Sequence, residues 1–325
     1  MLKKILIGIV VLIVVAAAGA WTWLALWLPR DIPVAAISVP QTPERIERGR
    51  YLANHVIGCT HCHSARDWSL FSAPIAVGGL GAGGQAFDEK VGFPGRLIAI
   101  NLTPTGLGEW SDGEILRAVT VGLSRDGHAL FPVMPYDAYR LLSTGDAEAI
   151  VAYLRSLPPV PDPVAAPAAG ERRLDFPLNL IANTIPAPAT PREIDPTDAL
   201  AQGEYLTTLA GCGFCHTPVD ERQRALPGMH FGGGRSWPVD GVDVRSANVS
   251  PDRETGIGDW TREDFIARFR RYQGAAGRIP VSDVGYNTQM PWTLYADMSD
   301  VDLGTIYEYL MKQPAVRNAV QVVGG

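Results

Sequence analysis

The chain has 325 residues, of which 46% are hydrophobic and 19% are charged, and its formal net charge at pH 7 is −6. This composition is typical of a folded protein with room for two or three domains, and it excludes a disordered chain. The acidic balance, without a Lys/Arg-rich stripe, argues against nucleic acid as a partner, because nucleic acid requires a basic face.

Residues 1–30 predict a membrane anchor. A pair of lysines precedes a long uncharged run that extends from Ile5 to Leu28. As a helix this run would be about 36 Å long, enough to cross a hydrocarbon core of about 30 Å. The lysines keep the N-terminal end in the cytoplasm, which predicts a single-pass protein of the bacterial cytoplasmic (inner) membrane with the rest of the chain on the periplasmic side. A cleaved signal peptide is the alternative, because Ala18-Gly19-Ala20 resembles a cleavage site, although the apolar run continues beyond it.

Two copies of a Cys-x-x-Cys-His pentapeptide contain all four cysteines of the chain. They are Cys59-Thr60-His61-Cys62-His63 and Cys212-Gly213-Phe214-Cys215-His216. This pentapeptide is the attachment signature of c-type haem, in which both thiols bond to the porphyrin and the histidine becomes an axial iron ligand. We therefore predict two covalently bound haem c groups with His63 and His216 as iron ligands. A dithiol or half of a zinc site would not explain a histidine at the same place twice.

The sequence around the pentapeptides also repeats. Segments that precede and follow each pentapeptide match in the same order, including Gly49-Arg50-Tyr51-Leu52 with Gly203-Glu204-Tyr205-Leu206, and Asn101-Leu102-Thr103-Pro104 with Asn248-Val249-Ser250-Pro251. The period is about 154 residues, which indicates a duplicated domain rather than a short-period array. We expect the anchor at 1–30, one domain at 40–160, a proline-rich linker at 161–198 and a second domain at 199–318.

Each repeat is predicted to be helical. In each repeat one helix leads into the pentapeptide, a short one follows a tryptophan, and a third closes the repeat. The expected ranges are 42–58, 112–120 and 145–157 in the first repeat and 197–211, 262–271 and 299–313 in the second. Thr42 followed by Pro43 is a typical helix start, and prolines follow both closing helices. Strand signals are few and short, so the predicted fold class is all-α. The apolar part of the linker, Leu174 to Ile185, is expected to pack on a domain surface.

A methionine in each repeat is the predicted sixth iron ligand. Met134 and Met290 follow His63 and His216 at nearly equal separations along the sequence, and each precedes a proline and an aromatic residue. Methionines elsewhere in proteins usually fill gaps in the core. Two methionines at equivalent places of a duplicated unit are better explained as thioether ligands.

Four other histidines compete with these methionines, but none has a counterpart in the other repeat. They are His55, His61, His128 and His230, and His61 is expected to face solvent. A metal-bound histidine normally donates its other ring N–H to a nearby acceptor. Pro74 and Pro227 follow the two ligand histidines at the same separation, so their carbonyls are the predicted acceptors, with ordinary loop prolines as the alternative.

Further paired residues are candidates for the haem surroundings. Trp110 and Trp260 occupy equivalent places and are expected to close the pocket wall, or alternatively to donate to a haem propionate. Arg96 and Arg245 are candidates for charge pairing with propionates.

The order of N-terminal helix, Cys-x-x-Cys-His, late Met-Pro and C-terminal helix resembles class I cytochrome c domains. The first repeat contains, in chain order, the motifs Asn-x-Thr-Pro, Gly-x-Trp-Ser, Arg-Asp-Gly-x-x-Leu, Met-Pro-Tyr and Ala-Tyr-Leu-Arg-Ser-Leu-Pro. This run of motifs resembles the cytochrome subunits of membrane-bound alcohol, aldehyde and gluconate dehydrogenases. It covers most of residues 45–160 and, more loosely, 199–314. The resemblance implies two tandem class I cytochrome c domains after one transmembrane helix. Those subunits usually carry three haems, whereas this chain has two pentapeptides and an N-terminal anchor.

Histidine and methionine together fill the axial positions of the iron, which suits electron transfer rather than bond chemistry. We predict a membrane-anchored dihaem c-type cytochrome, without catalytic residues, that passes single electrons between a dehydrogenase or quinol-oxidising complex and a terminal oxidase or other cytochrome. One alternative is a dihaem enzyme of the peroxidase or thiosulfate dehydrogenase type, which needs a labile or absent sixth ligand on one haem. The other is a structural subunit whose haems complete a respiratory assembly.

Overall fold

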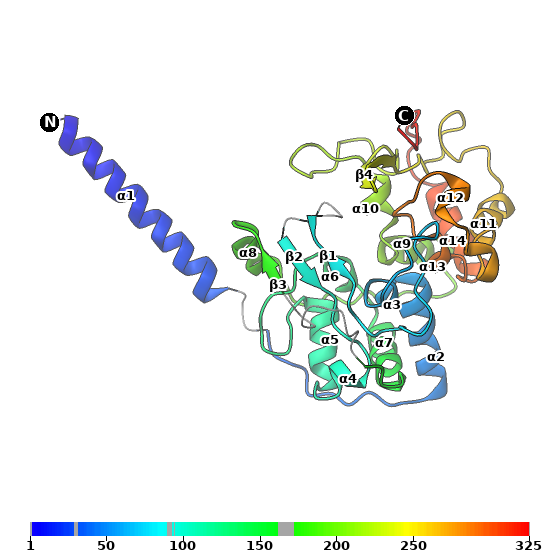
Figure 1. The fold of residues 1–325 in the computed structure, drawn as a ribbon, viewed down its shortest axis with the longest axis horizontal. Helices are drawn as coiled ribbons and strands as arrows, with labels where there is room; N and C mark the ends of the chain where they lie inside the picture. Colours follow the sequence, from blue (N-terminus) through cyan, green and yellow to red (C-terminus); the bar gives the residue numbers. More distant parts are fainter. Residues whose placement is uncertain (1, 29–31, 90–92, 94, 162–171, 325) are drawn as a thin grey trace.

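The computed structural model describes residues 2–28, 32–89, 93, 95–161 and 172–324, so part of the predicted anchor and of the predicted linker lies outside the described residues. Helix α1 (Leu2–Thr22) stands apart from the rest of the molecule and continues into the π-helical turn η1 (Trp23–Trp27), as Figure 1 shows. Within the described residues, α1 is the one helix long and apolar enough to cross a membrane, and a signal sequence would meet the same criteria.

In the first half of the remaining chain, the helix that leads to the pentapeptide packs on the helix that closes this half. Helix α2 (Pro43–Tyr51) begins at Thr42, whose hydroxyl accepts from the Arg45 N–H, and packs on α7 (Thr144–Ser156). The predicted helices of this half are therefore confirmed to within a few residues. Its other helices are the π-helical turn η2 (Leu52–Val56), α3 (Cys59–Cys62), α4 (Pro104–Leu107), α5 (Asp112–Val121) and α6 (Tyr136–Tyr139).

The second half repeats this arrangement. Helix α9 (Ala199–Leu209) packs on α14 (Asp300–Leu310) as α2 packs on α7. Helix α11 (Arg262–Arg270) matches α5, and both begin with a capping box, in which the N-cap hydroxyl and an acidic side chain satisfy each other's backbone N–H. The remaining helices are α10 (Cys212–His216), η5 (Gly274–Gly277), α12 (Val281–Val284) and α13 (Trp292–Tyr295).

A glycine marks the closest approach in each main helix pair. A Cβ atom at Gly49 of α2 would lie 1.8 Å from the Ala149 carbonyl oxygen, and one at Gly203 of α9 would lie 2.1 Å from the Thr305 carbonyl oxygen. Only glycine allows two backbones to come this close. The repeated glycine thus determines where each helix leading into a pentapeptide crosses its closing helix.

The described residues also contain short strands, which the all-α prediction did not include. Strands β1 (Ala86–Phe87), β2 (Gly95–Ile98) and β3 (Arg172–Leu174) form an antiparallel sheet in that order, and β4 (Ser236–Val239) pairs with β5 (Val242–Arg245). Strand β3 comes from the linker and pairs Leu174 with Gly95 of β2. The protein is mostly helical, and local sequence patterns did not indicate this pairing between distant segments.

The described part of the predicted linker lies against the first half and against η1, at the end of the predicted anchor. Asn183 Nδ2 donates to the Leu24 carbonyl of η1 at 3.1 Å, and helix α8 (Leu178–Ile181) and the 3-10 turn η4 (Ala182–Thr184) contact η1. Further on, the Thr190 N–H donates to the Arg140 carbonyl at 2.9 Å. Leu174 pairs with the first half through β3, but α8 and η4 contact the end of the predicted anchor, and Phe176 and Ile181 are 77% and 43% exposed. The expectation that the whole stretch Leu174 to Ile185 packs on a domain surface is therefore not met.

Equivalent tyrosines join the two halves in both directions. The Tyr51 hydroxyl of α2 donates to Asp302 at 2.5 Å and accepts from the N-cap N–H of α14 at 3.0 Å. The Tyr205 hydroxyl of α9 donates to Asp146 at 2.9 Å and accepts from the N-cap N–H of α7 at 2.9 Å. A continuous cluster of buried apolar residues, with members from both halves, accompanies these contacts.

Candidate haem sites

Each pentapeptide starts directly after a glycine in the left-handed backbone region. Gly58 has φ 70° and Gly211 has φ 69°, values that residues with a Cβ rarely adopt. The turn they make is followed by the short helices α3 and α10, which bring both cysteines of a pentapeptide onto one helical turn. All four cysteines carry free thiols in the described structure. Burial raises the pKa of Cys59 and Cys212 to about 12, so these thiols are protonated at neutral pH.

Both predicted ligand histidines contact a backbone carbonyl through Nδ1. His63 Nδ1 lies 2.9 Å from the Ile100 oxygen, and His216 Nδ1 lies 2.7 Å from the Ala247 oxygen. Burial lowers the pKa of both imidazoles, and the carbonyl contacts partly offset this shift. A neutral imidazole that donates from Nδ1 keeps its Nε2 lone pair for a metal ion, as haem ligation requires.

These carbonyls replace the acceptors predicted from sequence. The prediction that Pro74 and Pro227 accept from the histidines is wrong, and the Pro74 carbonyl instead accepts from the Asp67 N–H at 2.9 Å. In the second repeat the matching contact is made by Arg224, whose carbonyl accepts from the Asp220 N–H at 2.8 Å, so the equal spacing of the two prolines does not reflect equivalent places in the fold. Ile100 and Ala247 each stand immediately before the asparagine of the repeated Asn-x-Thr/Ser-Pro motif, which was the signal that could have identified them.

The predicted ligands of the second repeat line one cavity. Its volume is about 860 Å³, and the residues around it include Cys212, Cys215, His216 and Met290. Cofactor pockets typically measure about 300–1,000 Å³. The cavity is therefore large enough for a macrocycle, and the thiol, imidazole and thioether groups around it suit a covalently attached haem.

In the first repeat, Met134 is half-buried against the core and stands two residues before α6, as Met290 does before α13. The two methionines also share backbone geometry. The Met134 carbonyl accepts from the Tyr136 N–H at 2.8 Å, and the Met290 carbonyl accepts from the Trp292 N–H at 2.9 Å. The two Met-Pro segments thus have the same local turn.

A pair of tyrosines, which sequence reasoning missed, connects each methionine segment to its pentapeptide; Tyr139 is buried and Tyr295 is half-buried. The Tyr139 hydroxyl donates to the Ile57 carbonyl at 2.8 Å, and the Tyr295 hydroxyl donates to the Ala210 carbonyl at 2.6 Å. Burial, together with nearby cysteine thiols, raises the pKa of both phenols well above the ordinary value. The signal was present, because each tyrosine stands at the same separation after its predicted methionine ligand.

The competing histidines have other surroundings. His55 Nδ1 lies 3.4 Å from the Leu294 carbonyl, His128 contacts Asp126, and His230 lies 3.1 Å from the Thr217 hydroxyl.

The prediction that His61 faces solvent is wrong. Only 7% of its surface is exposed, and burial lowers its pKa to about 3. Phe214 at the equivalent place of the second pentapeptide is 62% exposed, so the two pentapeptides differ at this position.

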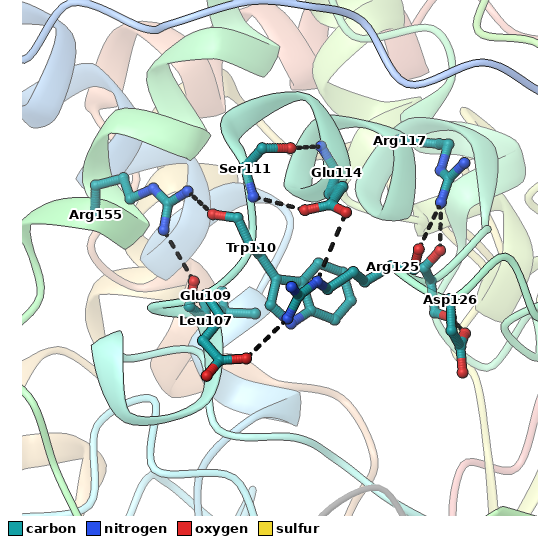
Figure 2. Close-up of polar contacts among 10 residues, drawn as sticks. Leu107, Glu109, Trp110, Ser111, Glu114, Arg117, Arg125, Asp126 and Arg155 are labelled. Carbon is teal, nitrogen blue, oxygen red and sulfur yellow. Dashed lines mark hydrogen bonds and ion pairs between the residues drawn. The ribbon is translucent and has the colours of Figure 1, made fainter.

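The paired tryptophans occupy positions suited to pocket walls. Trp260 lines the cavity of the second repeat, and Trp110 is half-buried against the core of the first. Figure 2 shows how Arg155 of α7 donates to the carbonyls of Leu107 and Trp110, which attaches this segment to the closing helix. Arg245 also lines the cavity.

Sequence comparison finds relatives among dehydrogenase cytochrome subunits, whereas no family model matches the chain. The gluconate 2-dehydrogenase cytochrome c subunit of Pantoea cypripedii is 30% identical over 299 residues, which cover 86% of this chain and 61% of the relative. The cytochrome c subunit of the alcohol dehydrogenase (quinone) of Gluconacetobacter polyoxogenes is 28% identical over 308 residues, covering 87% of this chain and 60% of the relative.

A third relative is similar over its full length. The diheme cytochrome c-type protein of Cereibacter sphaeroides is 25% identical over 337 residues, covering 97% of this chain and 100% of the relative. The chain thus spans 61% and 60% of the lengths of the gluconate and alcohol dehydrogenase subunits, and all of the diheme protein. The chain is therefore a homologue of the cytochrome c subunits of gluconate and alcohol dehydrogenases and of a diheme c-type cytochrome.

Proposed function

We propose that the chain is a membrane-anchored dihaem c-type cytochrome, with class I cytochrome c domains at 40–160 and 199–318 joined by the linker 161–198. It passes single electrons between a dehydrogenase or quinol-oxidising complex and a terminal oxidase or other cytochrome. The relatives named as cytochrome c subunits of dehydrogenases support a dehydrogenase as one partner, and an electron-transfer role rather than a catalytic one.

Each domain supplies a complete ligand set in this proposal. Bound haem c supplies a one-electron iron couple. The cysteines would attach the porphyrin, and a histidine and a methionine would bind the iron of each haem, which would leave no iron position open for substrate. The two sets are Cys59, Cys62, His63 and Met134, and Cys212, Cys215, His216 and Met290. The observation that carries the proposal is the cavity of about 860 Å³ that the second set lines.

Helix α1 is the proposed membrane anchor, with both haem domains on the periplasmic side. Its length and hydropathy and the tryptophans at its far end support this placement, because tryptophan is enriched where a helix leaves the bilayer. Trp21, Trp23 and Trp27 are all more than half exposed in the structure. An anchored cytochrome would exchange electrons by diffusion in the plane of the membrane.

The ligand assignment predicts a separate spectroscopic effect for each methionine. Thioether ligation of ferric haem gives a weak near-infrared sulfur-to-iron charge-transfer band. Met134→Ala should remove the contribution of one haem and Met290→Ala that of the other, whereas Met311→Ala, at a half-buried core position, should leave both. The measurement is the near-infrared spectrum of the oxidised protein. Retention of both contributions in either ligand variant would contradict the assignment.

A further inference from the structure

We propose that Ser72, which belongs to the first domain, is a positioning residue that fixes the Met290 segment of the second domain. The loop that carries it, residues 67–73, is named the Ser72 loop. The inference rests on the proposed ligation of the second haem by Met290, and it adds that this axial ligand is stabilised by the other half of the molecule.

The Ser72 hydroxyl contacts the backbone on both sides of the Met-Pro pair. Its Oγ donates to the Met290 carbonyl at 2.8 Å and accepts from the Trp292 N–H at 2.8 Å. The side chain is fully buried, so water cannot replace these bonds when the hydroxyl is removed. One hydroxyl thus fixes the turn from which the thioether extends.

Asn287 adds a second connection between the Ser72 loop and the Met290 segment. Its Oδ1 accepts from the Ser72 N–H at 2.9 Å, and its Nδ2 donates to the Trp68 and Leu70 carbonyls at 3.1 and 3.3 Å. Thr288, the next residue, also binds the Met290 backbone, because its hydroxyl accepts from the Met290 N–H at 3.1 Å. Both backbone polar groups of Met290 are therefore held.

The Ser72 loop is itself held in an unusual conformation. Ser72 has φ 66° and Ala73 has φ 39°, in the left-handed region that residues with a Cβ rarely adopt. Arg66 donates from Nε to the Ala73 carbonyl at 2.8 Å and from Nη2 to the Ser72 carbonyl at 3.1 Å, and its guanidinium lies 4.6 Å from the centre of the Trp68 ring. A strained loop that is buried at Phe71, Ser72 and Ala73 and has this much support is suited to holding another segment.

The same loop contributes a wall of the second cavity. Phe71 lines that cavity and is 5% exposed. Its ring stacks on Tyr272 at 5.9 Å, and Tyr272 stacks on Trp292, two residues after the methionine, at 4.9 Å. The first domain therefore completes the second site with an apolar wall as well as with hydrogen bonds.

The first site differs at the corresponding positions. The loop of the second half is three residues shorter, because its Asp220 N–H donates to the Arg224 carbonyl at 2.8 Å where the Asp67 N–H of the first half donates to the Pro74 carbonyl at 2.9 Å. No residue of the second half therefore corresponds to Ser72. The Met134 N–H donates to the Phe131 carbonyl at 3.2 Å within its own half. Loss of the Ser72 hydroxyl should consequently affect the second haem alone.

The test is displacement of the axial thioether by imidazole in the oxidised full-length protein, followed by loss of the charge-transfer band. For Ser72→Ala we expect the apparent imidazole affinity of the second haem to rise about tenfold, the equivalent of the ~1.4 kcal/mol that one buried hydrogen bond contributes. The affinity of the first haem should not change. Ser72→Gly should behave in the same way, and because glycine adopts the left-handed backbone region freely it protects the test against misfolding.

Ser69→Ala is the matched control, because its exposed hydroxyl lies on the same loop and contacts Asp67 at 2.6 Å. It should leave both affinities unchanged. The Met290→Ala variant assigns the second haem, and adding Ser72→Ala to it should have no further effect on the first. Unchanged affinity in both Ser72 variants, or equal changes at both haems, would overturn the role of Ser72. Retention of both bands in Met290→Ala would instead show that the ligand assignment is at fault, and the inference would fall with it.

Discussion

Tyr139 and Tyr295 fix the backbone just before each pentapeptide through a hydrogen bond from the phenol. Helices α3 and α10 have four and five residues, too few to be stable by their own hydrogen bonds. Each tyrosine hydroxyl donates to the carbonyl one residue before the left-handed glycine, and so stabilises the turn that presents the first cysteine. At this scale the sites depend on a few hydrogen bonds from outside the pentapeptides.

Removing either hydroxyl should destabilise the protein measurably. Tyr139→Phe leaves a carbonyl without its donor at a buried site and Tyr295→Phe leaves one at a part-buried site, and loss of a buried partner costs about 1–3 kcal/mol. Tyr307→Phe is the control, because its hydroxyl also donates to a carbonyl, that of Trp260 at 2.7 Å, but at an exposed site. Urea unfolding of the three variants should rank Tyr139→Phe and Tyr295→Phe above the control. Equal stability of all three would contradict the assigned role.

The thiols, histidines and methionines were predicted as haem ligands because each type occurs at equivalent places in two repeats. The sequence did not identify the histidine acceptors, because spacing along the chain does not determine which carbonyl a folded loop brings to Nδ1. Burial of His61 was not predicted either, because the pentapeptide pattern does not show how its middle residue is covered in the fold. Ser72 has no repeated counterpart, so the duplication offered no signal for it.

Two equivalent helix crossings organise the elements. In each half the helix that leads into the pentapeptide passes the closing helix at a glycine, Gly49 against Ala149 and Gly203 against Thr305. The helix of the pentapeptide follows a few residues later, so the crossing point sets its position relative to the core. A displacement of this crossing would move the cysteines and the ligand histidine together.

Gly49→Ala and Gly203→Ala should therefore destabilise the fold strongly. The added methyl group would meet a carbonyl oxygen at 1.8 or 2.1 Å, and overpacking of this kind typically costs about 1–3 kcal/mol, more where backbone must move. Gly145→Ala in α7 is the matched control, because nothing lies within 4 Å of its added Cβ. It should be neutral or stabilise the helix by up to about 1 kcal/mol. Thermal unfolding distinguishes these outcomes, and a neutral result at Gly49 and Gly203 would show that the crossing can relax.

Helices were predicted better than strands for a physical reason. Caps, prolines and apolar periodicity act locally, so α2, α7, α9 and α14 were predicted to within a few residues at most of their ends. The sheet β1-β2-β3 depends on the linker returning to the first half, a long-range contact that local patterns do not encode.

At the scale of the whole molecule, the two halves are fixed against each other. The reciprocal contacts of Tyr51 with Asp302 and of Tyr205 with Asp146 join each half to the closing helix of the other. The phenol of Tyr295 lies close enough to cysteines of both pentapeptides for their thiols to contribute to its raised pKa. Two electron-transfer centres held close together in this way would form a short internal path.

Electron paramagnetic resonance of the oxidised full-length protein, with haem quantified per chain, tests the central proposal most directly. Two closed histidine–methionine ligand sets predict two covalently bound haems per chain, both low-spin ferric, without a high-spin signal. A high-spin ferric haem in the unmodified protein, or one haem per chain, would contradict the proposal and favour a dihaem enzyme with an open iron position.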